Sequence, residues 1–237
     1  MQHAILTLAL GLLITAPAAA APLALVFRGD GVSRTVAVTE TLTVDEEPWQ
    51  GPPRHKLETR EMLMERVARP FPPDHIAVER IYLTKTGARS IAVARSMIDA
   101  RGIAPPSGGA EDSGGLPQLR LVLPPGPVEP GATWSYTRPP TRLFPQALEV
   151  RFKLASVTGT RAVIEGTCAG TCAVKPGALG LDFTWHSRVR FDVAGGRALE
   201  ARVKSRLAIT YEKREPDRPK RIRMQSETVT AEQEPKR

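Results

Sequence analysis

The chain has 237 residues, and its 33 lysines and arginines against 25 aspartates and glutamates give a formal net charge of +8 at pH 7. This length suits one large domain or two small ones. The sequence contains no G-x-S-x-G, Walker, H-E-x-x-H or EF-hand motif, so we expect a protein that is not an enzyme and needs no cofactor or metal.

Residues 4–16, AILTLALGLLITA, form an apolar run that is followed by PAAAAP. A run of this length before small residues is typical of a secretory signal, and it is too short to span a bilayer. Cleavage after Ala20 fits the A-x-A pattern, although the segment MQH before the run lacks Lys and Arg. We therefore expect residues 1–20 to be a signal peptide, and the mature chain to be periplasmic or secreted with no transmembrane segment.

Residues 21–101 are expected to form an N-terminal β region. Apolar and polar residues alternate between Val36 and Val44, which indicates a strand. Residues 57–67 fit either a strand or a short helix, and we interpret them as a strand because their neighbours are strands. Residues 76–85 and 90–97 flank the turn sequence TGAR and predict a hairpin.

Residues 102–118, GIAPPSGGAEDSGGLPQ, offer almost nothing to bury and are predicted to be a loop or linker. A C-terminal β region over 119–237 follows, which we expect to form one continuous domain with the N-terminal region. In the segment PGPVEPGATWSY (125–136), Pro130-Gly131 suits a type II turn, and Trp134 and Tyr136 begin a strand.

The hairpin at 179–211 is the most informative part of the sequence. Its first strand has an apolar face at the odd positions and a polar face at the even ones. A three-residue Ala194-Gly195-Gly196 loop with Gly196 in the left-handed conformation would pair Val193 with Arg197, Phe191 with Leu199 and Trp185 with Ser205. A further strand at 221–232 is predicted to join the same sheet. The apolar face is a candidate ligand surface made of Leu181, Phe183, Trp185, Val189, Phe191, Val203, Leu207 and Ile209.

Cys168 and Cys172 are the only cysteines, and they could form a redox site, a metal site or a disulfide. A zinc site needs about four ligands, and a thioredoxin-type site uses C-x-x-C at the start of a helix. Here the spacing is C-x-x-x-C, and the flanking residues indicate a strand, a Cys168-Ala169-Gly170 turn and a second strand that pairs Ile164 with Val174. In an oxidising compartment this arrangement predicts a disulfide between Cys168 and Cys172.

The PV-x-x-G-x-TW pattern within residues 125–136 resembles a segment of exported bacterial all-β proteins of unknown function. With the long alternating strands that follow, the chain is similar in outline to the LolA/LolB-like lipoprotein-carrier superfamily, whose curved sheet forms an open half-barrel around lipid. We expect an all-β, mainly antiparallel fold, either such an open half-barrel or two stacked sheets, with little helix.

Two functions of different classes remain. The first is a binding protein of the bacterial envelope that holds a lipid or another apolar ligand on its curved sheet. The second is a structural or interaction protein of the envelope with a closed core and no small-molecule ligand.

The basic run at 212–223 could contact an anionic envelope surface or be a solvated hairpin tip. No nucleic-acid partner is expected for an exported chain. The pairs Asp182–His186 and Asp74–His75 are interpreted as solvated polar residues rather than a hydrolytic site.

Overall fold

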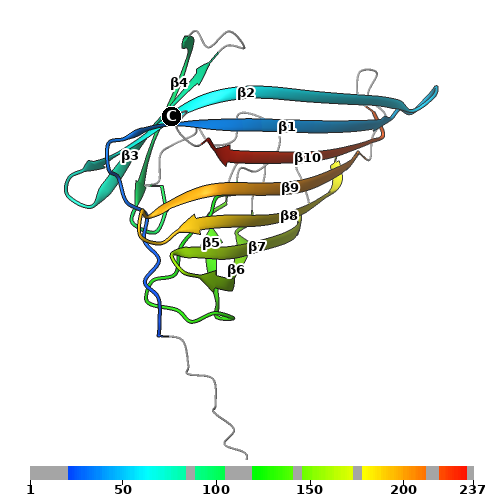
Figure 1. The fold of residues 1–237 in the computed structure, drawn as a ribbon. Coiled ribbons are helices and arrows are strands. Elements are labelled where there is room, and N and C mark those ends of the chain that lie inside the picture. Colours follow the sequence, from blue (N-terminus) through cyan, green and yellow to red (C-terminus); the bar gives the residue numbers. More distant parts are fainter. Residues whose placement is uncertain are drawn as a thin grey trace, which may run out of the picture.

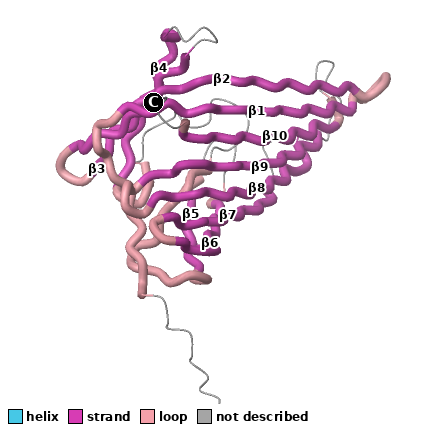
Figure 2. The backbone as a smooth tube through the Cα atoms, in the orientation of Figure 1, coloured by secondary structure: helices cyan, strands magenta, loops and turns pink. Residues whose placement is uncertain are grey.

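The computed structural model describes residues 21–83, 89–104, 119–140, 146–172, 178–211 and 219–233. The predicted signal peptide, the first three residues of the predicted TGAR turn (86–88) and most of the predicted linker lie outside these residues. Every regular element in the described ranges is a strand (Figure 2). The strands are β1 (Ser33–Glu47), β2 (Arg54–Phe71), β3 (His75–Leu83), β4 (Arg89–Asp99), β5 (Thr133–Arg138), β6 (Leu148–Thr158), β7 (Arg161–Cys172), β8 (Ala178–Asp192), β9 (Arg197–Tyr211) and β10 (Arg221–Glu232). The prediction of an all-β protein is confirmed.

The ten strands form a single antiparallel sheet in the order β4-β3-β2-β1-β10-β9-β8-β7-β6-β5. The first and last strands of the chain are neighbours in the middle of the sheet, and β4 and β5 form its two edges. Figure 1 shows a strongly curved sheet in which β3 and β4 cross the direction of β1 and β2 steeply. The predicted alternative of two stacked sheets is therefore not what the chain forms.

The strand predictions are confirmed at several places. The ambiguous segment 57–67 lies within β2, β3 pairs with β4 as a hairpin, and β10 joins β9 in the same sheet. The Ala132 amide donates a hydrogen bond to the Glu129 carbonyl over 3.0 Å, and Gly131 has a φ of 92°. With proline at position 130 this is the predicted type II turn.

The β8–β9 register is as predicted over most of its length and wrong near the turn. Trp185 faces Ser205 and Arg190 faces Glu200, but Phe191 faces Ala198 rather than Leu199. The connection is one residue longer than predicted, so Val193 does not pair with Arg197. Asp192 accepts a hydrogen bond from the Gly195 amide over 3.1 Å, and the Gly196 carbonyl accepts one from Arg28 over 2.9 Å. Gly196 has the predicted positive φ, at 59°.

The predicted disulfide between Cys168 and Cys172 is wrong. Both cysteines lie in β7, which passes through the supposed Cys168-Ala169-Gly170 turn without reversing, and Ile164 faces Val189 rather than Val174. Four steps along a strand separate two Cα atoms by about 13 Å, whereas a disulfide requires less than about 7 Å. Cys168 is a free, buried cysteine.

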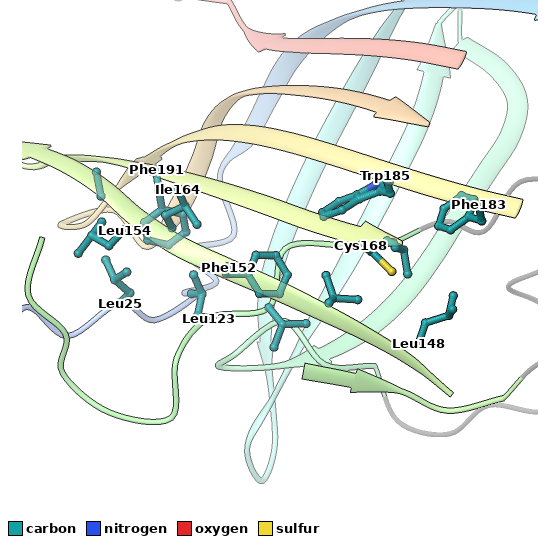
Figure 3. Close-up of a cluster of buried hydrophobic side chains, with 14 of the residues drawn as sticks. Leu25, Leu123, Leu148, Phe152, Leu154, Ile164, Cys168, Phe183, Trp185 and Phe191 are labelled. Carbon is teal, nitrogen blue, oxygen red and sulfur yellow. The ribbon is translucent and has the colours of Figure 1, made fainter. Parts of the chain in front are cut away.

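The hydrophobic core fills the inner face of the sheet at the β6–β8 end (Figure 3). Residues 23–27 and 119–128 cross this face and cover it, held by the backbone pairing of Leu23 with Val128 and by a hydrogen bond of 2.7 Å from Trp134 Nε1 to the Val122 carbonyl. The buried members of this core are Leu25, Leu119, Val122, Leu123, Leu148, Val150, Phe152, Leu154, Ala162, Ile164, Cys168, Leu181, Phe183, Trp185, Phe191 and Leu207.

Candidate binding site

A cavity of about 340 Å³ lies on the same face of the sheet, beside the filled core. Its walls come from both halves of the chain, which the β1–β10 pairing brings together. Its border includes residues 27, 28 and 30, residues 119–121 and residues 195–198. The lining consists of Phe27, Arg28, Asp30, Arg34, Val36, Met64, Arg66, Ala68, Ile76, Val78, Arg80, Ile98, Gly102, Leu119, Arg120, Leu121, Ser187, Val189, Gly195, Gly196, Arg197, Ala198, Ala201, Val203 and Thr230.

The walls of the cavity are mainly apolar. Val36 and Met64 face each other across β1 and β2 and belong to a second, smaller buried cluster. On the other side Val189, Ala201 and Thr230 form a cross-strand row over β8, β9 and β10. The small side chain of Ala201 in the middle of this row leaves space where a larger residue would fill the cavity.

Arginines and Asp30 line one end of the cavity, and Glu232 pairs with three of these arginines. Glu232, at the end of β10, lies 3.4 Å from Arg34, 3.3 Å from Arg66 and 3.4 Å from Arg197. Asp30 also pairs with Arg34, and this contact holds the pKa of the Asp30 carboxyl well below its usual range. Burial lowers the pKa of the Arg66 guanidinium, and the charge of Glu232 opposes that effect. This end is a preformed, charged and partly buried network.

The structure divides the predicted apolar ligand face between core and cavity. Val189 and Val203 line the cavity, and Val203 also packs against the filled core. The remaining six pack in or against the filled core: Leu181, Phe183, Trp185, Phe191 and Leu207 are buried there, and Ile209 is partly buried against it. Trp185 is 1% exposed, with its ring 6.3 Å from that of Phe152 in an edge-to-face arrangement, so the surroundings of Trp185 are packed rather than hollow.

The arginines of the cavity have a recognisable pattern in the sequence, which the sequence analysis did not identify as a site. Where the strands β1, β2 and β3 line the cavity, each carries one arginine two positions from an apolar residue on the same face. Arg34 lies two positions before Val36, Arg66 two after Met64 and Arg80 two after Val78. Charged residues on an otherwise apolar strand face are rarely buried unless they have partners or a function. Three such residues in three successive strands point to a site.

The other candidate residues do not gather into a site. Asp182 and His186 are exposed on the outer face of β8, and His75 begins β3 while Asp74 is exposed in the turn before it. Within the described ranges, no cluster of His, Cys, Asp and Glu could hold a metal ion. Most of the basic run at 212–223 lies outside those ranges. The part of the chain that the structure describes contains no helix of a length and apolarity that could cross a membrane.

Comparison of the sequence with protein-family models and with curated proteins gives no match.

Proposed function

We propose that the protein is an exported binding protein of the bacterial envelope that holds a lipid or another apolar ligand in the cavity of its curved sheet. The observation that carries the proposal is the apolar-walled cavity of about 340 Å³. This volume falls within the range of small-molecule sites, which are largely preformed and lined by apolar side chains with a few polar groups. A carrier role would also agree with the resemblance to the LolA/LolB-like superfamily.

Filling the cavity tests this function. Ala201 lies in the first half of β9 with its side chain on the cavity wall, and strands accept aromatic residues well. We expect Ala201→Trp to fold, because its indole enters space rather than packed atoms, and to weaken the binding of decan-1-ol at least tenfold in calorimetric titration. Thr184→Trp places the same side chain on the exposed outer face of β8, and this control should bind decanol like the parent protein.

The second candidate function is a structural or interaction protein of the envelope. The packed core around Trp185 favours it, because that part of the inner face has no space for a ligand. The same titration separates the two functions. If the parent protein binds neither decanol nor its acid, decanoate, the binding function is rejected and the structural one is favoured.

A further inference from the structure

Three arginines lie directly opposite one another on three neighbouring strands. Arg34 of β1 is the cross-strand partner of Arg66 of β2, and Arg66 is the partner of Arg80 of β3. All three line the cavity. Like charges at directly opposed positions destabilise a sheet, so this row weakens the fold unless counter-charges compensate it.

The counter-charges are concentrated at one end of the row. Glu232 contacts Arg34 and Arg66, and Asp30 contacts Arg34. Arg80, at the other end, donates a hydrogen bond of 3.3 Å to the neutral Ser96 hydroxyl. Among the described residues, no carboxylate lies within ion-pair distance of Arg80. Burial lowers the pKa of the Arg80 guanidinium; the positive charges of Arg120 and Arg66 add to that effect, and Tyr82 opposes it. The environment of Arg80 is therefore suited to receive an anion.

An apolar track leads away from Arg80 along the same strand face. Val78 and Ile76 are the next two residues on this face of β3, and both line the cavity. Each step of two residues advances about 6.8 Å along a strand, so the track from Arg80 to Ile76 extends for about 14 Å. Ala68, opposite Val78, and Ile98, opposite Ile76, widen it on either side.

We propose that the ligand of this cavity is a single-chain amphiphile whose anionic group, a carboxylate or a phosphate, is bound by Arg80 with Arg66 beside it. The acyl chain lies along Val78 and Ile76. The guanidinium group presents forked donors that match carboxylate and phosphate oxygens. A volume of about 340 Å³ is near the lower end of the range for ligand sites, which suits one acyl chain rather than two. This inference rests on the proposed function, since it names the ligand class of the same cavity.

The experiment titrates the purified protein with decanoate, decan-1-ol and inorganic phosphate, the first two below their aggregation limits. Decanoate and decanol share a chain length and differ in charge. We expect decanoate to bind at least tenfold more tightly than decanol, because charge-assisted hydrogen bonds exceed neutral ones. Arg80→Gln should remove this difference, because it weakens the binding of decanoate far more than that of decanol. Arg206→Gln removes the same charge from the exposed outer face of β9 and should change neither titration.

Decyl phosphate, titrated in the same way, distinguishes the two headgroups at the same chain length: a preference for it over decanoate identifies phosphate, and the reverse identifies carboxylate. If decanol and decanoate bind equally in the parent protein and in Arg80→Gln, the anionic ligand class is rejected while the proposed function stands. If phosphate alone binds as tightly as decanoate, Arg80 belongs to a free anion site and the amphiphile is rejected.

Two further measurements keep the proposal testable if Arg80→Gln fails to fold. Arg80→Lys retains the charge and loses the fork, so we expect decanoate affinity between those of the parent protein and of decanol. In the parent protein, added salt should weaken decanoate binding and leave decanol binding unchanged. Decanoate affinity that is unaffected by both changes would overturn the proposal.

Discussion

Trp185 is the largest fully buried side chain of the protein, and its surroundings determine what its removal should do. Its ring packs against Phe152 and over Gly166. Because the side chain is 1% exposed and lies in the main hydrophobic core, we expect Trp185→Ala to lower the free energy of unfolding by about 3–5 kcal/mol, as other large-to-small core changes do. Urea unfolding measures this. Leu57→Ala, at a side chain that is 60% exposed, is the control and should change stability by less than about 0.5 kcal/mol. A Trp185→Ala protein as stable as the parent would contradict the packed core.

Cys168 is a buried thiol whose reactivity should be low. Burial raises the pKa of this thiol, the nearby charge of Arg138 opposes that effect, and the charge of Glu149 adds to it. Because the thiolate is the reactive form, we expect iodoacetamide to label Cys168 slowly in native protein and rapidly in urea. Peptide mapping of non-reduced protein should find no link between Cys168 and Cys172, and a linked peptide would contradict the pairing of β7 with β8.

The raised pKa of Cys168 makes the free energy of unfolding depend on pH. Its pKa is raised in the folded protein, so the folded state retains the proton to higher pH than the unfolded state does. The contribution is therefore fully present below the ordinary thiol pKa of about 8.5 and is lost as the pH rises above it. Replacing Cys168 with alanine should remove this alkaline loss, which unfolding measured against pH would detect.

At the scale of single elements, β7 depends on a glycine. A Cβ atom at Gly166 would lie 2.6 Å from Ser187 Oγ and 2.7 Å from Trp185 Cζ3, both on the neighbouring strand β8. We expect Gly166→Ala to destabilise the protein by about 1–3 kcal/mol, as overpacking of a core does. Gly180→Ala is the matched control, because it lies in β8 with no atom within 4 Å of the added carbon. Equal stability of the two variants in urea unfolding would contradict the close packing of Trp185 on β7.

The strands themselves could be predicted from alternation, and their ends could not. The pairing of Trp185 with Ser205 follows from a local rule, since a hairpin loop of known length fixes the register. At Phe191 the turn makes contacts that the loop rule does not include: the distant Arg28 amide donates to the Gly196 carbonyl, and within the turn the Asp192 carboxylate accepts from the Gly195 amide. The error at Cys168 has a similar origin. A glycine after a small residue is typical of a turn, but Gly170 instead lies within β7. It lies close to β6, because an added Cβ atom at Gly170 would be 2.5 Å from Leu148 Cδ2.

At the scale of the whole molecule, neither the cover of the core nor the cavity could be predicted from local patterns. The segments 23–27 and 119–128 are too short, and alternate too little between apolar and polar residues, for their sequence to show that they cover the sheet. Their role depends on where the sheet curves. The arginine row requires the register of β1, β2 and β3 together. Each arginine could be seen in the sequence, but their alignment is a property of the assembled sheet.

The strand order also has a consequence for how the protein folds. Every pair of neighbouring strands is consecutive in the chain except β1 and β10, which join its two ends. Bringing distant segments together costs chain entropy and slows folding. We expect the hairpins within β1–β4 and within β5–β10 to form first. The pairing of β1 with β10, which we call the seam, should form last. Pulse-labelling hydrogen exchange during refolding would then protect the amides that bond between β8 and β9 before those that bond between β1 and β10, and simultaneous protection would contradict this order.

Until the seam closes, β1 and β10 both present open edges that can pair with another chain. Refolding yield should therefore fall as protein concentration rises.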